Sequence, residues 1–495
     1  MATTRTAISP ANVATCALLL SALAALGFIE VPAMVDYLNH LARMELLSEG
    51  NEHPAYAIAW RIQPNSALDL IVPPLGRLMG VEAALRVFLG VAFALIVSGA
   101  VAVERAVKGR HEFAGLCAMA VLFSLPLTWG MVNFTLGVGI ALWGVALWVR
   151  LSAAGGWQLW LAHSATVLAL FVSHFFALGL YGLVIGLIEI SALVACPARP
   201  TKVVRRGVMM AAPVVVLLAA LAMSGGAIGT PELPVWNFEL KAYWPLTFMN
   251  AYDRLAGLTA TLVGLALLLW LGFSRRLRLT LSGTFIALGL AGLYAAMPVT
   301  LFGIAYLDVR LLSWAALILP SFVVAKPGGW RLAAGTLLAT IAATNGAVAL
   351  KAWHDLQPDY AEIRKSFALI QPGSAVLIAM EDGLPLSDQP LLYAPTLAVP
   401  EAKAFVSSFY GSPSGFPIET KSPYDRLAVT RPIEYVPPTV TALHRWRLLP
   451  PQLRTWSRDF QYLYVIGRPA SGAAVVHTAP IFVGRRFTLY RINPD

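Results

Sequence analysis

Long apolar segments follow one another along residues 1–350 and exclude an ordinary soluble fold. Hydrophobic residues make up 58% of the 495 residues and charged residues only 13%, about half the share typical of soluble proteins. Because about 20 apolar residues cross a bilayer as a helix, the sequence predicts a polytopic α-helical membrane protein. About eleven transmembrane helices are expected, at 11–30, 81–103, 113–127, 132–149, 158–173, 176–195, 208–224, 255–273, 281–297, 311–325 and 332–350.

The basic residues indicate the side of the membrane on which each loop lies. The net charge is +10, and the basic clusters lie in short loops between apolar segments, as the positive-inside rule predicts. We therefore expect no nucleic-acid partner, a cytoplasmic N-terminus, and an extracytoplasmic position for residues 32–80 and for everything after Leu350. The run 11–29 can also be read as a secretory signal peptide, and its cleavage would leave the later orientation unchanged.

Two parts of the chain do not have the pattern of membrane spans. Within the transmembrane domain, 1–350, the first outer loop, 32–80, has two helical patterns that we expect to lie on the outer surface. They cover 34–48 and 68–78, and Pro73-Pro74 should break the second one. Residues 351–495 have a soluble composition and predict a small α/β domain, with a helix at 358–370, strands at 373–380, 462–466 and 487–492, and an irregular middle at 382–438.

Three reactive side chains share one face of the first outer helix. Asp36, His40 and Arg43 stand at helical spacing directly after the first apolar segment. A carboxylate beside a membrane cavity can act as a general base, because partial desolvation raises its pKa. His40 could orient Asp36 or contact a phosphate, and Arg43 could hold a phosphate oxygen. The alternatives are a solvated polar face on an interfacial helix and an Asp36–Arg43 salt bridge without a catalytic role.

Further candidates lie in other outer segments. Arg310, in a short outer loop with Asp308, could grip the phosphate of a lipid-linked substrate, and a plain ion pair between the two is the alternative. Asp69 is either a second acid of the site or a helix N-cap. His174 lies near the outer end of its span, where it could face a cavity, although a packed, hydrogen-bonded histidine is the commoner case.

The sequence lacks the common motifs of soluble catalysis. We find no Walker loop, no dinucleotide fingerprint, no HExxH, no nucleophile elbow and no Asp-x-Asp pair. The three cysteines have no metal-ligand spacing. Glu381-Asp382 could bind a cation, and a turn is the alternative. No cofactor is expected to be required, and a divalent cation is possible without being indicated.

The predicted architecture resembles the GT-C class of integral membrane glycosyltransferases, with an inside N-terminus, an acidic residue in a first outer loop with two surface helices, many spans and a C-terminal extracytoplasmic domain. Three segments are also similar to a group of bacterial multi-spanning proteins placed near that class, namely Pro32-Ala-Met-Val-Asp-Tyr-Leu-Asn-His-Leu-Ala-Arg43, Pro64-Asn-Ser-Ala-Leu-Asp69 and Tyr306-Leu-Asp-Val-Arg310. The resemblance covers about residues 1–350 and implies a GT-C-like fold and a polyprenyl-phosphate sugar donor. It assigns to Asp36 the role of catalytic base or metal-binding acid. Because Tyr37 follows Asp36 where some members have a second acid, a metal-free inverting transfer is expected.

Three functional hypotheses follow from these patterns. The first is a glycosyltransferase of the bacterial inner membrane, which moves the sugar to an extracytoplasmic glycan, lipid or protein acceptor. The second is a transporter or flippase of a lipid-linked or anionic substrate, which should show charges near mid-membrane and internal repeats. The third is a non-catalytic envelope assembly protein. The predicted span centres carry almost no charge and no repeat is evident, so the sequence favours transfer.

Overall fold

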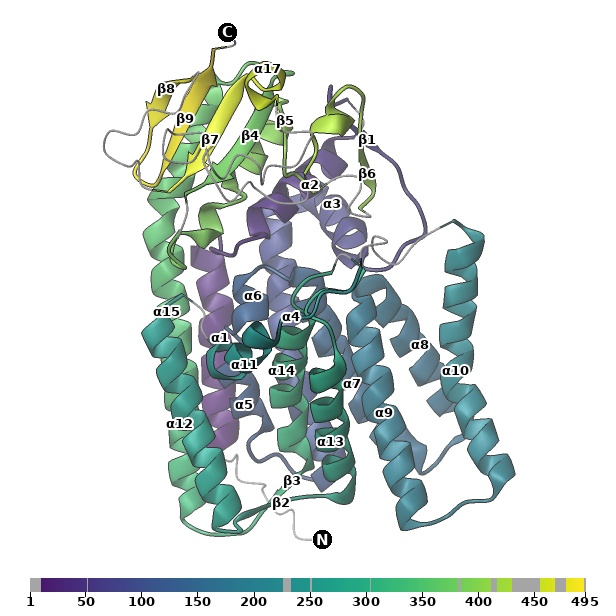
Figure 1. Ribbon diagram of the computed structural model, residues 1–495. Coiled ribbons are helices and arrows are strands. Elements are labelled where there is room, and N and C mark those ends of the chain that lie inside the picture. The colour runs from purple at the N-terminus through teal and green to yellow at the C-terminus, as the bar shows by residue number, and fades with distance from the viewer. Residues whose placement is uncertain are drawn as a thin grey trace.

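A long helical bundle carries a β-sheet at one end in the computed structural model of the protein (Figure 1). The structure describes residues 10–50, 52–225, 233–249, 252–302, 304–381, 384–410, 416–429, 455–467 and 478–493. We call the end of the bundle that meets the sheet the sheet end, and the opposite end, where strands β2 (Leu277–Leu279) and β3 (Val323–Ala325) pair, the far end.

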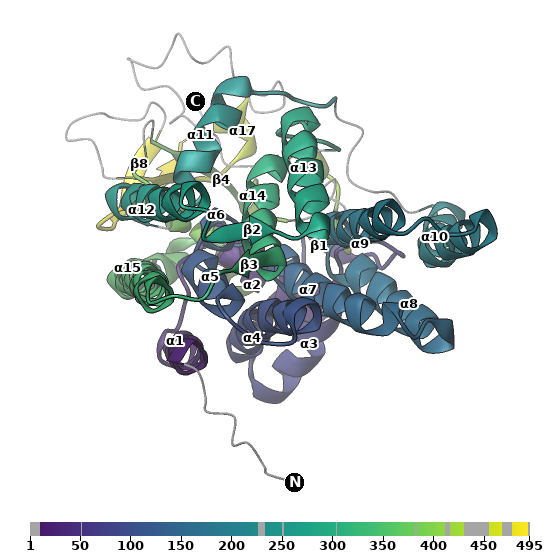
Figure 2. The same ribbon diagram turned by 90° about the horizontal axis from the view of Figure 1, so that it is seen from below.

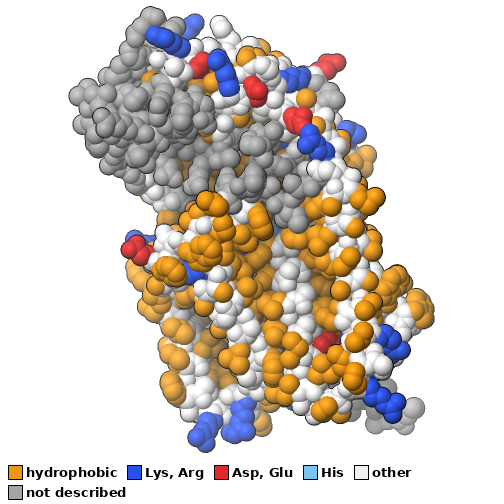
Figure 3. Space-filling model, turned by 45° about the vertical axis from the view of Figure 1, so that its right-hand side comes forward, with side chains coloured by type: hydrophobic (Ala, Val, Ile, Leu, Met, Phe, Trp, Pro, Cys, Tyr) orange, Lys and Arg blue, Asp and Glu red, His pale blue; other side chains and the backbone are white. Residues whose placement is uncertain are grey.

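Seven helices in the described part are long and apolar enough to cross a membrane. They are α1 (Pro10–Phe28), α4 (Val81–Lys108), α7 (Val132–Ser152), α9 (Phe175–Ala195), α10 (Pro200–Met223), α12 (Arg254–Phe273) and α15 (Trp330–Ser366). Each coincides with a predicted span. Hydrophobic side chains cover the flank of the bundle, and basic side chains gather at its far end (Figure 3). The protein is therefore a multi-pass membrane protein, as its sequence predicts.

The remaining predicted spans are helical but shorter. They correspond to α8 (Gly156–Ser173), α13 (Leu281–Ala296), the pair α5 (Ala114–Val121) and α6 (Leu125–Thr128), and α14 (Leu307–Ile318). Two of these segments contain a proline, which lacks a backbone N–H and disfavours helix in the residue before it. Pro126 lies at the start of α6, and Pro320 follows α14, where the chain changes to a 3₁₀ turn and then to β3.

The helices connect alternately at the two ends of the bundle. At the far end, Lys108 donates to the carbonyl of Pro320 over 3.0 Å, and the amide of Lys326 donates to Arg276 over 2.9 Å. At the sheet end, the amide of Phe175 donates to the side chain of Asn65 over 2.7 Å. Seen from below, the helices surround α5 and α14 (Figure 2). Loops far apart in sequence therefore meet at each end.

The first loop forms two helices that lie between the bundle and the sheet. They are α2 (Tyr37–Glu49) and α3 (Ala67–Met79). Their position on the outer surface stays a prediction, but the alternative of a solvated polar face is wrong for α2, because most of its side chains are buried, polar ones included. The predicted break at Pro73-Pro74 is also wrong: α3 continues through both prolines. Because Pro73 and Pro74 have no N–H group, the carbonyl groups of Asp69 and Leu70, both in the first turn of α3, lose their helical hydrogen-bond donors.

The sheet has five strands in the order β5-β4-β7-β9-β8. These are β5 (Phe405–Val406), β4 (Ala375–Met380), β7 (Tyr462–Ile466), β9 (Phe487–Ile492) and β8 (Thr478–Val483). The first three run parallel, and β9 is antiparallel to both of its neighbours. The three predicted strands are present, whereas β5 and β8 were not predicted. A separate pair, β1 (Tyr56–Ile58) with β6 (Ile418–Thr420), ties the first loop to the later chain.

The last long helix enters the sheet region without a break. The sequence predicts a span to Leu350 and a separate helix from Pro358, but α15 is continuous from Trp330 to Ser366, with Pro358 inside it. The hydroxyls of Ser366 and Tyr464, on β7, are hydrogen-bonded to each other. The bundle and the sheet are thus joined by one uninterrupted helix, which limits their relative motion.

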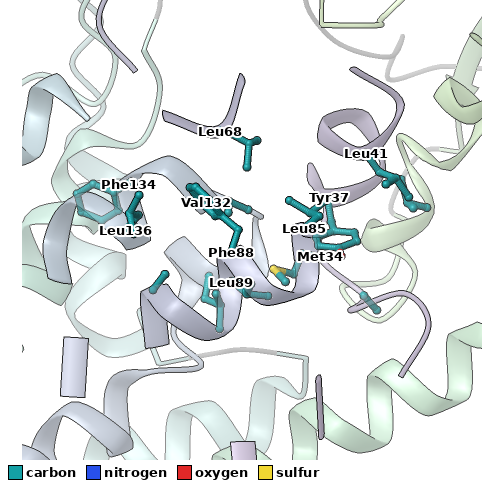
Figure 4. Packing of buried hydrophobic residues seen from close by; sticks show 14 of the residues in the cluster. Met34, Tyr37, Leu41, Leu68, Leu85, Phe88, Leu89, Val132, Phe134 and Leu136 are labelled. Carbon is teal, nitrogen blue, oxygen red and sulfur yellow. The ribbon is translucent and has the colours of Figure 1, made fainter. Parts of the chain in front are cut away.

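Apolar packing fixes the first loop on the bundle. Met34 and Tyr37 lie against Leu85 and Phe88 of α4 in Figure 4. Below them α4 and α7 approach closely, since a Cβ on Gly139 would lie 2.6 Å from the Cβ of Leu95. Burial of each large apolar side chain contributes about 1.5–3 kcal/mol. The start of α2 is therefore held rigidly above α4 and α7.

Candidate functional site

Asp36 lies where several loops of the sheet end converge. Its amide donates to the carbonyl of Trp129 over 3.1 Å, and the amide of Val35 donates to Thr128 over 3.0 Å. Asp36 occupies the N-cap position of α2, but its side chain makes no capping hydrogen bond. The carboxyl group is therefore free to point away from the helix and toward the loops around it.

The surroundings of Asp36 shift its carboxyl group toward the protonated form. Burial raises the pKa of Asp36 from 3.8 to about 7. A hydrogen bond from the side chain of Tyr410 and the positive charges of Arg310 and Arg43 lower this pKa in part. The residue still keeps some surface open to solvent. A carboxylate with a pKa near 7 is suited to accept a proton from a hydroxyl group.

Gly130 allows the turn before α7 to approach Asp36. Its φ of +79° lies in the left-handed region, which favours glycine. A Cβ at this position would lie 2.9 Å from the amide nitrogen of Asp36 and 3.1 Å from its Cβ. Any larger residue would push the turn and the carboxylate apart.

His40 contacts the same turn rather than the carboxylate. Its Nε2 lies 3.2 Å from the carbonyl oxygen of Gly130, so Nε2 carries the proton and donates it. Burial, with help from the charge of Arg43, lowers the pKa of His40 well below its ordinary value. Nδ1 has no hydrogen-bond partner within the described part of the chain. His40 is thus a neutral ring that fixes the turn beside Asp36.

Arg43 pairs with Asp69 and not with Asp36. Its Nε lies 2.7 Å from Oδ1 of Asp69, and neither side chain has any exposed surface. The guanidinium group also lies 3.8 Å from the centre of the Phe416 ring. Burial raises the pKa of Asp69, and Arg43 opposes this effect. The capping alternative for Asp69 is wrong, because Ser66 is the N-cap residue of α3.

Arg310 is a buried cation held by neutral groups. Its Nη1 lies 3.1 Å from Nε2 of His174, and its Nη2 donates to the carbonyl of Ala305 over 3.2 Å. The ring centre of Phe134 lies 5.5 Å from the guanidinium carbon. Among the residues that the structure describes, Arg310 forms no ion pair, and Asp36 is the carboxylate on which its charge acts. The two therefore belong to one electrostatic site.

Asp308 does not pair with Arg310, so the plain ion pair considered from sequence is absent. Its Oδ1 accepts from the amide of Val309 over 3.0 Å, and the cation whose charge acts on it is Lys241. The backbone turns sharply at Tyr306, where φ is +61°. Asp308 and Arg310 are two residues apart in the first turn of α14, so they point to nearly opposite sides of the helix and meet different surroundings.

Asn39, which lies on the polar stripe that the sequence predicts on α2, brings to the site one residue that the sequence did not single out, Tyr410. The side chain of Asn39 donates to the carbonyl of Ser408 over 3.0 Å and accepts from the amide of Tyr410 over 2.9 Å. These two hydrogen bonds, which we call the clamp, hold Tyr410 beside Asp36. A contact between residues this far apart in sequence leaves no local pattern, so only the structure could find it.

Metal ligands do not gather in the described residues, which contain no group of three or more His, Cys, Asp or Glu placed to hold an ion. Of the candidate pair Glu381-Asp382, Asp382 lies outside the residues that the structure describes. A small cavity of about 30 Å³ lies next to the site, lined by Phe134, Ser124 and Ser313 among others. It has room for about one water molecule, so it is not a substrate chamber.

No protein-family model matches the chain, and no curated protein matches it. Among solved structures, it is similar to the crystal structure of ArnT from Cupriavidus metallidurans bound to undecaprenyl phosphate, at 13% identity and a TM-score of 0.48, over 97% of each chain. It is also similar to the cryo-EM structure of the arabinofuranosyltransferase AftD from Mycobacteria, at 15% identity and a TM-score of 0.40, over 99% of this chain and 42% of that one. These likenesses concern the fold alone.

Proposed function

We propose that the protein is a membrane glycosyltransferase that moves a sugar from a polyprenyl-phosphate-linked donor to an extracytoplasmic acceptor. The observation that carries this proposal is the pairing of two unlike groups at the sheet end. Asp36 is a carboxylate whose pKa burial raises to about 7. Arg310 is a buried guanidinium group without an ion-pair partner in the described part of the chain, and its charge acts on Asp36. A base and an anion site that influence each other suit a transfer with a phosphate leaving group.

Asp36 acts as the general base in this proposal. Its carboxylate takes the proton of an acceptor hydroxyl group as the oxygen attacks the anomeric carbon of the donor sugar. A base with a pKa near the working pH combines a large ionised fraction with a strong pull on the proton. Direct attack with one base inverts the anomeric centre, in line with the expectation from sequence.

Arg310 stabilises the leaving group. The bond from the anomeric carbon to the phosphate oxygen breaks, and negative charge develops on the departing polyprenyl phosphate. A guanidinium group binds phosphate oxygens through parallel N–H donors, and a preorganised cation in a low-dielectric site favours that developing charge. Arg43 is less suited to bind the leaving phosphate, because its guanidinium group is already paired with the buried carboxylate of Asp69.

The orientation follows from charge. Basic residues lie at the far end, where Lys108, Arg276 and Lys326 connect neighbouring helices, and the positive-inside rule places such loops in the cytoplasm. The sheet end then faces the extracytoplasmic side of a bacterial inner membrane. Residues 1–350 form the membrane domain with about eleven spans, and 351–495 form the extracytoplasmic α/β domain. The acceptor is a glycan, a lipid or a protein.

The decisive experiment replaces the base. Full-length Asp36→Asn in proteoliposomes is supplied with a panel of polyprenyl-phosphate-linked sugars, and the release of polyprenyl phosphate is measured. Because a general base contributes about 10²–10⁴-fold, we expect release to fall by at least about 100-fold. The matched control is Asp253→Asn, at an exposed N-cap of the same end, where Asn caps equally well. Normal release by correctly inserted Asp36→Asn would remove Asp36 from the mechanism.

A further inference from the structure

The segment that follows β5 reaches out of the sheet and onto the first helix of the site. Residues 407–410 leave the sheet at Val406, and the side chain of Asn39 clamps them through the carbonyl of Ser408 and the amide of Tyr410. Both clamp distances, 3.0 and 2.9 Å, are those of good hydrogen bonds. The clamp joins α2 to a segment 369 residues later in the chain.

The clamp directs the phenol ring of Tyr410 into the polar face of α2. The ring centre lies 5.3 Å from that of His40, and the guanidinium carbon of Arg43 lies 5.8 Å from it. The phenol group hydrogen-bonds the carboxyl group of Asp36. Tyr410 therefore touches the side chains of the helix face on which the proposed base stands.

We propose that Tyr410 is a positioning residue for Asp36, so that the sheet-bearing part of the chain completes the transfer site. This inference rests on the function proposed above. The phenol O–H donates to one carboxylate oxygen, keeps its own proton, and leaves the second oxygen to face the acceptor hydroxyl group. A donor of this kind favours the charged form of a carboxylate and restricts its rotation. The acid–base behaviour of Asp36 is then set in part by a residue from the other end of the chain.

The effect of the Tyr410 hydrogen bond on the pKa of Asp36 can be separated from the effects of the other groups around Asp36. Arg310 on α14 and Arg43 on α2 also favour the ionised carboxylate. His40 is neutral, and the carboxylate of Asp69 on α3 stands behind Arg43, to which it is paired. Removal of the phenol O–H leaves all four of these groups in place. Any change in the titration of Asp36 is then caused by the lost hydrogen bond.

The test removes only the hydroxyl group. In full-length Tyr410→Phe we expect the titration midpoint of Asp36 to rise by about one pH unit, since a hydrogen bond to a charged group is worth about that much. The midpoint is read from the carboxyl C=O band in infrared difference spectra, with Asp36→Asn to assign the band. The acid limb of the pH–rate profile should move by the same amount, while the donor KM stays within about threefold. Tyr424→Phe, which loses a hydrogen bond to the carbonyl of Gly373 away from the site, is the matched control.

A second variant tests the clamp. Asn39→Ala removes both contacts to residues 408–410 without touching the phenol group, and we expect the same upward movement of the Asp36 midpoint. An unchanged midpoint in Tyr410→Phe would overturn the positioning role. If the unsubstituted protein releases no polyprenyl phosphate from any donor while Tyr410→Phe still moves the midpoint, the proposed function fails but the contact inferred here stands, so the two failures are distinguishable.

Discussion

Arg43 and Asp69 form an ion pair inside the protein, with 2.7 Å between Nε and Oδ1 and no exposed surface on either side chain. The pair joins α2 to α3 beneath the ring of Phe416. Both Nη atoms of Arg43 lack hydrogen bonds within the described residues. A charge buried in this way is strongly tied to its partner, so the pair belongs to the scaffold that supports Asp36.

Breaking this pair should destabilise the protein strongly. Removal of one partner leaves the other charge buried and uncompensated, which costs about 3–5 kcal/mol. We expect such a loss in unfolding free energy for Asp69→Asn, measured by denaturant unfolding in detergent micelles with tryptophan fluorescence. The exposed pair Arg61–Glu419 is the control, and Arg61→Ala should cost less than about 1 kcal/mol. A small effect for Asp69→Asn would mean that water or a ligand compensates Arg43.

Much of the fold could be predicted from the sequence because its signals are local. Apolar segments near 20 residues marked the long spans, and the strands at Tyr462–Ile466 and Phe487–Ile492 were found within their structural bounds. Prolines were the main source of error. Pro73, Pro74 and Pro358 lie inside continuous helices, since tertiary packing outweighs the loss of one or two hydrogen bonds.

The sequence predicted which polar residues form the candidate site. It did not predict which of them contact each other. Spacing placed Asp36, His40 and Arg43 on one helix face, but the partners of that face come from other segments. Asp69 pairs with Arg43 from α3, and Tyr410 reaches Asp36 from the sheet. A pattern in one segment contains no information on which distant residue will compensate a buried charge.

The raised pKa of Asp36 should make stability depend on pH. Because burial raises this pKa from 3.8 to about 7, the folded protein holds more protons than the unfolded chain between these values. The unfolding free energy should therefore fall as pH rises from about 4 to about 7, by at most about 1.4 kcal/mol per unit of the shift. Asp36→Asn should flatten this slope and be the more stable protein at pH 8.

Thermal unfolding of both proteins in detergent between pH 4 and pH 8 measures the difference. Other groups titrate in the same range, and burial also raises the pKa of Glu45 to about 7. They contribute equally to both proteins, so subtraction isolates Asp36. Parallel curves for the two proteins would show that the carboxyl group of Asp36 is well solvated in the folded state.

His174 should affect the binding of the sugar donor through its contact with Arg310. Nδ1 of His174 lies 3.2 Å from the amide of Phe176 at the start of α9, and Nε2 lies 3.1 Å from Nη1 of Arg310. A neutral imidazole accepts at one nitrogen only, and arginine can only donate, so the Arg310 contact requires Nε2 to accept and the helix cap requires Nδ1 to accept. His174→Asn keeps an N-cap side chain but is too short to hold the guanidinium group. We expect its KM for a polyprenyl-phosphate sugar to rise about tenfold, the equivalent of about 1.4 kcal/mol, with near-normal stability. His174→Ala should show the same rise in KM, and a loss of about 1 kcal/mol of stability in this variant is the sign of a capping Nδ1. If only the alanine variant changes, and only in stability, the histidine serves as a helix cap and the donor phosphate does not depend on its contact with Arg310.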